Sequence, residues 1–159
     1  MGGRFSFRPV RALDLDLASS VHRESFVPLG ERSWTRQDLG ELLASPGVSG
    51  QFVQIDGQDV GFALYRVVAD EAELLTIAVN GDRRRLGAGR ALLGTIIALA
   101  RAEGARILFL EVGVDNQSAL ALYAQMGFQL IGRRASYYER RGSPRAAALV
   151  MRLELTSGG

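Results

Sequence analysis

The stretch Arg83-Arg84-Arg85-Leu86-Gly87-Ala88-Gly89-Arg90 separates two segments with different patterns. The apolar run 74–79, Leu-Leu-Thr-Ile-Ala-Val, precedes it and is typical of a buried strand. Residues 91–101 follow it, with apolar side chains at helical spacing. The first N–H groups of a helix have no internal partner, and the helix dipole adds positive charge there. This strand, turn and helix therefore predict a site for an anion, phosphate above all.

Three kinds of phosphate loop match parts of this stretch. A P-loop requires Lys after its last glycine, where this chain has Arg90, and the chain contains no Lys. A dinucleotide-binding loop requires a third glycine at the position of Leu92. The acyl-CoA pyrophosphate loop of the GNAT acetyltransferases is written Q/R-x-x-G-x-G/A, and residues 84–89 resemble it at every fixed position. The alternative is a basic turn whose glycines only allow tight packing.

The composition is that of an ordinary globular chain. Its 159 residues, 47% hydrophobic and 23% charged, predict a single domain over 1–159, ordered from about 4 to 155 with a loose tail at 156–159. The chain has no Cys, which excludes disulfides, thiolate chemistry and Cys-ligated metals. Its single histidine, His22, cannot form a metal cluster alone, so we expect no metal site and a packing or surface role for His22.

The charge pattern favours local anion binding. All 19 basic residues are arginine, the net charge is only +2, and the arginines gather at 83–90 and 133–145. We therefore expect no general nucleic-acid surface. The chain has no run of 18 apolar residues and no apolar signal region at its start, so we expect a cytoplasmic protein without a membrane span.

The periodicities predict an α/β domain on a mixed sheet, in the order β-α-α-β-β-β-α-β-α-β-β. Pro9 marks the first strand as an edge or a bulge, and Asp56-Gly57 is a hairpin signal. Thr35 and Asp38, with Trp34 before them, form an N-cap pair that opens the second helix. The expected strands are 5–10, 52–55, 60–65, 71–79, 106–114, 128–133 and 147–155, and the expected helices are 14–25, one starting at 35, 89–103 and 117–126.

One carboxylate stands in an apolar strand. Glu111 follows Ile-Leu-Phe-Leu at 107–110 and precedes Val112. A buried charge is costly unless it is hydrated, paired or used, and burial raises the pKa of a carboxyl group, which suits a general base. The alternative is a glutamate at a strand end that pairs with an arginine.

The segment Asn116-x-x-Ala119-x-x-Leu122-Tyr123-x-x-x-Gly127-Phe128 is more specific than any single residue. Asn116 is an N-cap candidate, and Tyr123 lies two turns later on the same helix face. The segment closely resembles the CoA-side helix of GNAT enzymes, and the 84–89 loop precedes it at the right separation. The resemblance implies the GNAT fold, a mixed and mostly antiparallel sheet flanked by helices, with acetyl-CoA as co-substrate.

The resemblance narrows to the RimI family, which acetylates the N-terminal alanine of a small-subunit ribosomal protein. Residues 70–74, 77–79 and 110–112 carry it, together with Arg133-Arg134 and Tyr137-Tyr138. It extends over about residues 60 to 155 and is weak in the first 45. Arg145-Ala146-Ala147 stands where the family often has an acidic pair, which leaves the peptide substrate less defined than the cofactor.

The resemblance also implies roles for residues. Glu111 would be the general base and Tyr123 the general acid, with Tyr123 also near the cofactor. Arg133, Tyr137 and Tyr138 would help to bind the acceptor peptide. Acetyl-CoA would be bound by backbone groups or side chains of Ile77, Ala78, Val79, Arg84, Arg85, Leu86, Gly87, Ala88, Gly89, Arg90 and Asn116.

Three functions remain open from the sequence. The first is an N-α-acetyltransferase that acts on a protein N-terminus, with a small-subunit ribosomal protein as its partner. The second is a GNAT enzyme that acetylates a small amine. The third is a CoA-binding module without catalysis, which would need neither Glu111 nor Tyr123.

Overall fold

The computed structural model describes residues 4–29, 33–81, 87–135, 137–138, 144–145 and 147–155. Arg84, Arg85, Leu86, Ala146 and the tail 156–159 therefore lie outside the described residues. The arginine- and glycine-rich stretch 83–90 is described from Gly87 onward.

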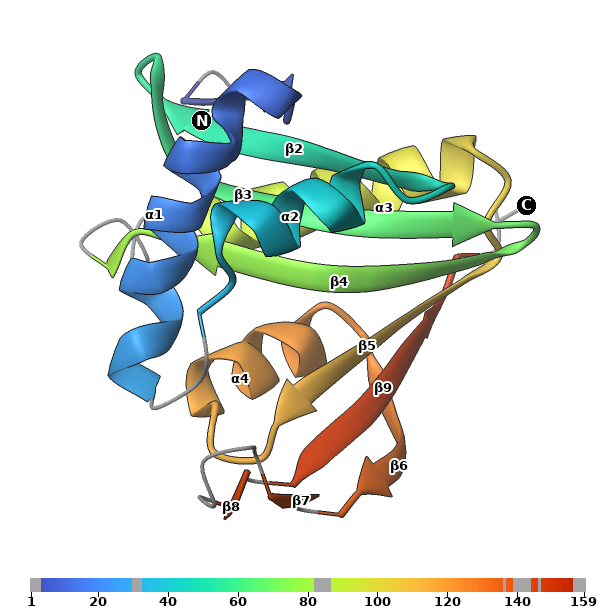
Figure 1. Ribbon diagram of the computed structural model, residues 1–159. Coiled ribbons are helices and arrows are strands. Elements are labelled where there is room, and N and C mark those ends of the chain that lie inside the picture. The colour runs from blue at the N-terminus through green and yellow to red at the C-terminus, as the bar shows by residue number, and fades with distance from the viewer. Residues whose placement is uncertain are drawn as a thin grey trace.

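A seven-stranded sheet runs through the molecule in the order β1-β2-β3-β4-β5-β9-β6 (Figure 1). Neighbouring strands are antiparallel except for β4 and β5, which are parallel. The mixed, mostly antiparallel sheet of the GNAT fold is thus confirmed. The strands are β1 Phe5–Pro9, β2 Val48–Ile55, β3 Gln58–Val68, β4 Glu71–Val79, β5 Ile107–Gly113, β6 Gln129–Arg134 and β9 Ala148–Glu154.

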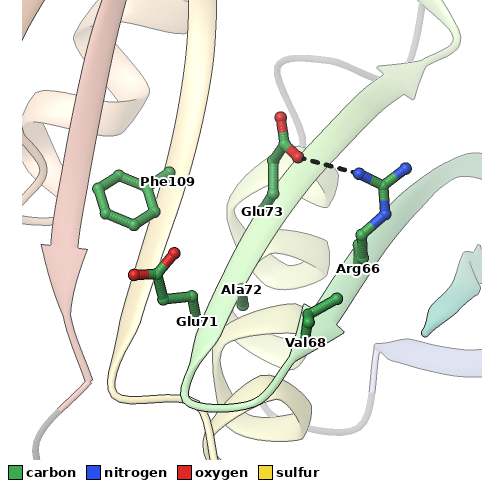
Figure 2. Close-up of a pocket in the computed structure, with 6 residues that line it drawn as sticks. All are labelled: Arg66, Val68, Glu71, Ala72, Glu73 and Phe109. Carbon is green, nitrogen blue, oxygen red and sulfur yellow. Dashed lines mark hydrogen bonds and ion pairs between the residues drawn. The ribbon is translucent and has the colours of Figure 1, made fainter. Parts of the chain in front are cut away.

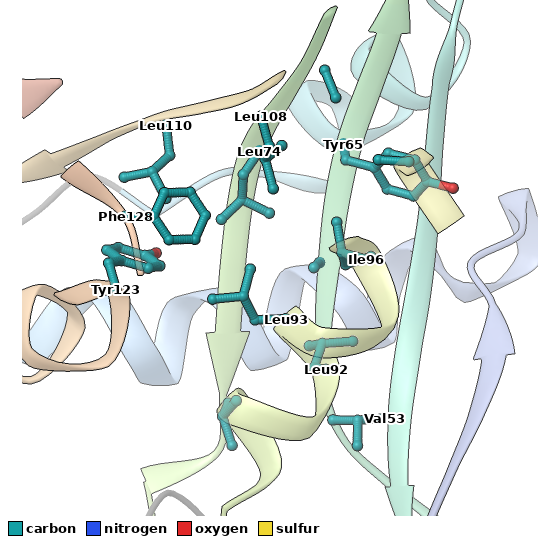
Figure 3. Packing of buried hydrophobic residues seen from close by; sticks show 14 of the residues in the cluster. Val53, Tyr65, Leu74, Leu92, Leu93, Ile96, Leu108, Leu110, Tyr123 and Phe128 are labelled. Carbon is teal, nitrogen blue, oxygen red and sulfur yellow. The ribbon is translucent and has the colours of Figure 1, made fainter. Parts of the chain in front are cut away.

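Four α-helices cover the two faces of the sheet. Helices α1 (Leu15–Phe26) and α2 (Arg36–Leu43) pack on one face, where Ala18, Val21 and Leu39 meet Phe52, Phe62 and Leu64. Helices α3 (Ala88–Ala102) and α4 (Gln117–Gln125) pack on the other. Figure 3 shows this second core, in which Leu92, Leu93 and Ile96 of α3 face Val53, Tyr65 and Leu74 of the sheet.

The observed order of long elements is the predicted one, with small additions. Two short 3₁₀ helices, Ala12–Asp14 and Val27–Leu29, flank α1. A pair of two-residue strands, β7 (Tyr137–Tyr138) and β8 (Pro144–Arg145), forms a separate ribbon between β6 and β9. Strands this short carry no periodicity, so the sequence indicated only a connection there.

The capping box, the hairpin turn and the edge-strand proline predicted from the sequence are all observed. Thr35 and Asp38 form a reciprocal capping box at the start of α2. Asp56 and Gly57 both have positive φ, 51° and 82°, which the tight hairpin between β2 and β3 requires. Pro9 lies in β1, an edge strand, where a missing N–H does not interrupt the sheet. None of the described helices is both long enough and apolar enough to cross a membrane.

Candidate active site

Strands β4 and β5 pair only over their first three residues, Glu71 to Glu73 with Ile107 to Phe109. The register of β4 against β3 shifts between Thr76 and Leu74, which leaves Leu75 as a bulge. Beyond this point β4 continues beside β3 and β5 continues beside β9, and the two strands diverge (Figure 1). Among the strands that the structure describes, none pairs with the second half of β4 along this edge.

The alternation of the ladder shows which backbone groups face that edge. The N–H of Asn80 donates to the carbonyl of Val60 at 2.8 Å, and hydrogen-bonded pairs alternate along an antiparallel ladder. Ala78, opposite Phe62, therefore uses its backbone groups to bind β3. Ile77 and Val79 direct theirs toward the side from which β5 has diverged. Of the three residues assigned to the cofactor from the sequence, Ile77 and Val79 face this edge, and the Val79 carbonyl accepts there from the Ser25 hydroxyl at 2.8 Å.

Helix α3 begins beside this edge. Gly87 is its N-cap in the left-handed conformation, with φ of 84°, and the first helical bond runs from the N–H of Ala91 to the carbonyl of Gly87 at 3.0 Å. The N–H groups of Ala88, Gly89 and Arg90 thus lack acceptors within the helix. A Cβ on Gly89 would lie 3.8 Å from Val79 Cγ2, which shows how closely the helix start packs on the end of β4.

Helix α4 brings a tyrosine to the same region. Asn116 is the N-cap of α4, as predicted, and its Oδ1 accepts from the N–H of Ala119 at 3.2 Å. Tyr123 is 4% exposed and packs against Phe128, with 5.6 Å between ring centroids (Figure 3). Burial raises the pKa of Tyr123 above that of a free tyrosine, so the hydroxyl stays protonated at neutral pH. Arg90 donates to the Gln125 side chain at 3.4 Å and links the start of α3 to the end of α4.

Glu111 lies on the opposite side of β5 from Tyr123. Leu110 and Val112 point into the core that contains Tyr123, so alternation turns Glu111 to the other face. The side chain is 40% exposed and its Oε2 accepts from Arg134 Nη2 at 2.8 Å. Glu111 is therefore partly exposed and paired with an arginine, the alternative that the sequence left open, and its role as general base stays a prediction.

The pairing across β9 explains why Arg134 reaches this carboxylate. Glu111 is opposite Val150, and Arg134 is opposite Ala148, so all four side chains share one face. Arg133 is opposite Leu149 and lies on the other face, away from Glu111. The register of β6, which shifts at Ile131, sets these two faces, and the role of Arg133 in binding the acceptor peptide stays a prediction.

Comparisons with known proteins identify the family of this chain. The model of the acetyltransferase (GNAT) family matches residues 15–128, about three quarters of the chain. The chain belongs to the GNAT acetyltransferase family. It is therefore an enzyme of the N-acetyltransferase class, as the sequence resemblance implied.

Several named GNAT relatives match most of the chain. It is 40% identical over 123 residues to ribosomal protein bS18-alanine N-acetyltransferase of Escherichia coli K12, covering 77% of this chain and 82% of that protein. It is 34% identical over 134 residues to N-alpha-acetyltransferase RimI of Mycobacterium tuberculosis, covering 82% of each. The crystal structure of the Escherichia coli S18-alanine enzyme superposes with a TM-score of 0.83 at 29% identity, covering 98% of this chain and 96% of that one.

The remaining residues assigned from the sequence lie at the β6–β9 end of this GNAT fold. Tyr137 and Tyr138 form β7, which pairs with Arg145 and Pro144 of β8. This places their backbone just beyond Arg134. Their contribution to binding an acceptor stays a prediction.

A separate hollow opens at the other end of the GNAT sheet, where β4 and β5 are still paired (Figure 2). Arg66 donates to Glu73 there at 3.5 Å. The lining residues come from the end of β3 and the starts of β4 and β5: Arg66, Val68, Glu71, Ala72, Glu73 and Phe109. The hollow is thus distinct from the diverging edge beside α3.

Proposed function

We propose that the protein is an acetyl-CoA-dependent N-α-acetyltransferase of the RimI type that modifies the N-terminal amine of a ribosomal protein, with alanine as the first residue. The observation that carries this proposal is the similarity to the bS18-alanine enzyme over four fifths of that enzyme's length. A ribosomal substrate also implies a cytoplasmic enzyme.

The residues at the end of β4 and the start of α3 fit acetyl-CoA. Phosphate oxygens match the N–H groups of Ala88, Gly89 and Arg90, and Gly89 leaves the backbone accessible. The backbone of Ile77 matches the amides of an extended pantetheine chain. Acetyl-CoA would supply the acetyl group as a thioester.

Glu111 and Tyr123 are suited to the two proton transfers that acetylation of an ammonium requires. The amine must lose a proton before it attacks, and the departing thiolate must gain one. Glu111 is an exposed carboxylate that can accept a proton directly or through water. Tyr123 is a buried, protonated phenol that can donate one. Glu111 and Tyr123 lie on opposite sides of β5. This suits an acceptor amine and an acetyl donor that approach from different faces of the sheet.

The pKa of the acceptor explains why one carboxylate is enough. An α-amine has a pKa near 8 and a lysine side chain near 10.4, so the α-amine is deprotonated about a hundred times more often at neutral pH. Either ammonium must lose one proton, and for the α-amine this costs less free energy, so a single carboxylate such as Glu111 suffices.

The test is tandem mass spectrometry after incubation with acetyl-CoA. One peptide begins with Ala and contains an internal Lys, and a second has the same sequence with a blocked N-terminus. We expect acetylation at the α-amine of the first peptide and almost none on lysine in either. Acetylation mainly on lysine, or only on small amines, would contradict the RimI-type assignment while leaving the GNAT family membership intact.

A further inference from the structure

Helix α1 carries three buried polar side chains in one stripe. Ser19, His22 and Ser25 are spaced by three residues and are 7%, 2% and 4% exposed. Each makes a hydrogen bond to the backbone of another segment: Ser19 and His22 to Trp34, and Ser25 to Val79. The Ser19 hydroxyl donates to the carbonyl of Trp34 at 3.1 Å, and His22 Nδ1 accepts from the N–H of Trp34 at 3.0 Å. The stripe thus connects α1 to the start of α2.

The third member of the stripe connects α1 to β4 instead. The Ser25 hydroxyl donates to the carbonyl of Val79 at 2.8 Å. The same peptide unit is bound on its other side, because the N–H of Asn80 donates to Val60 at 2.8 Å. The last peptide of β4 is therefore fixed from both directions, by a strand and by a helix.

This peptide lies next to the proposed cofactor site. The side chain of Val79 lies beneath Gly89, within 3.8 Å of the place that a Cβ would take. On the other side, a Cβ on Gly61 would come within 2.7 Å of the Ala78 carbonyl and 3.0 Å of Val79 Cγ2. The end of β4 is thus held between β3, α1 and the N-terminus of α3. A small rotation of the Val79 peptide would change the spacing between the β4 edge and the α3 start.

We propose that Ser25 is a positioning residue for acetyl-CoA binding, which it serves by fixing the Val79–Asn80 peptide at the junction of β4 and α3. This inference rests on the proposed function. Ser25 acts through the backbone and needs no contact with the acetyl donor. Removing its hydroxyl takes one donor from the carbonyl of the buried Val79, which weakens the constraint on this peptide.

Ser19 provides a matched control. It lies on the same stripe of the same helix, is similarly buried, and also donates to a backbone carbonyl, but its partner Trp34 belongs to the α2 side. Ser25→Ala and Ser19→Ala each remove one buried hydroxyl and should lower the melting temperature by similar amounts. Only Ser25→Ala should weaken acetyl-CoA binding.

The experiment measures acetyl-CoA affinity by isothermal titration calorimetry, and KM for acetyl-CoA and kcat with an Ala-starting peptide. For Ser25→Ala we expect Kd and KM for acetyl-CoA to rise about fivefold, the change that one hydrogen bond of about 1 kcal/mol corresponds to. The kcat at saturating acetyl-CoA should stay near that of the unmodified protein. Ser19→Ala should leave Kd and KM unchanged.

A second pair of variants separates the hydrogen bond from packing. The side chains introduced by Ser25→Thr and Ser25→Val have nearly the same shape and differ in the hydroxyl. The Ser25→Thr variant should therefore bind acetyl-CoA more tightly than the Ser25→Val variant. Equal affinities in this pair, or equal affinities in the two alanine variants, would overturn the role of Ser25. If the unmodified protein fails to bind acetyl-CoA, the proposed function itself falls, and this inference with it.

Discussion

For Glu111, the sequence pattern predicted that the residue lies in a strand but not which face of the sheet its side chain takes. The sequence showed a carboxylate among apolar neighbours, and the structure confirms that β5 is a strand. Both faces of β5 are apolar around it because Phe109 and Ile107 line the outer face as well. Periodicity alone therefore did not show which face Glu111 would take. The partner Arg134 lies 23 residues away and becomes a neighbour only through the register of β6 on β9.

The role of Glu111 can be tested against a second glutamate. We expect Glu111→Gln to lower kcat/KM for an Ala-starting peptide by about 10²–10⁴, the usual contribution of a general base. Glu73 is a suitable control because it is also on a strand, is 48% exposed and pairs with an arginine, Arg66, at 3.5 Å. Glu73→Gln should leave kcat/KM within about twofold of the unmodified enzyme. Equal losses in the two variants would remove Glu111 from the mechanism.

For helix α3, the sequence predicted where the helix begins and ends but not which residues it packs against. The sequence predicts this helix over 89–103, and the glycines that flank the observed helix, Gly87 and Gly104, both have positive φ, 84° and 100°. The helix itself is Ala88–Ala102, within one residue of the prediction. Its packing partners could not be derived in the same way. Gly89 packs near Leu122 of α4, more than thirty residues later, and that contact depends on the whole fold.

The interior glycine of α3 gives a prediction about this element. Gly94 is in the middle of the helix, and a Cβ added there would meet no atom within 4 Å. Gly94→Ala should therefore raise the free energy of unfolding by about 0.5–1 kcal/mol, because alanine loses less backbone entropy in a helix. Urea denaturation monitored by circular dichroism measures the change.

Gly87 is the matched control for that substitution. Its φ of 84° is a conformation that alanine rarely adopts, so Gly87→Ala should lower the free energy of unfolding. Stabilisation by alanine at both positions would mean that α3 does not begin with a left-handed residue.

At the scale of the whole molecule, the sequence predicted the order of the long elements but not the divergence within the sheet. The order followed from periodicity, caps and turns, which are local. The divergence depends on the bulge at Leu75 and on where the pairing of β4 with β5 stops, after Glu73. The bulge and the end of the pairing both depend on hydrogen bonds between strands that are distant in the sequence. The sequence therefore predicted a set of candidate residues, whereas the open edge of β4 beside which the candidate site is proposed follows from the structure.

The stability of the whole molecule should depend on pH through His22. The imidazole is stacked between Phe26 and Trp34, and its Nδ1 accepts a backbone N–H, so the structure holds it neutral. Burial lowers the pKa of His22 from 6.5 to about 4, and nearby Asp38 only partly opposes this shift. In the unfolded chain the same group binds a proton below about pH 6.5. The unfolded state thus binds more protons between pH 6.5 and 4, and the folded state loses stability as the pH falls through that range.

The expected loss is about 2 kcal/mol of unfolding free energy between pH 7 and pH 5, from the lowered pKa of His22 alone. His22→Gln removes the titrating group and keeps an acceptor for the Trp34 N–H, so the variant should be less sensitive to pH over this interval. Asp14, whose carboxyl pKa is lowered by its hydrogen bond with Arg8, is present in both proteins and cancels in the comparison. The measurement is urea denaturation of both proteins at pH 7, 6 and 5. Parallel pH dependence in the two proteins would show that His22 can take up a proton within the folded structure, against the neutral imidazole that its stacking and its acceptor role require.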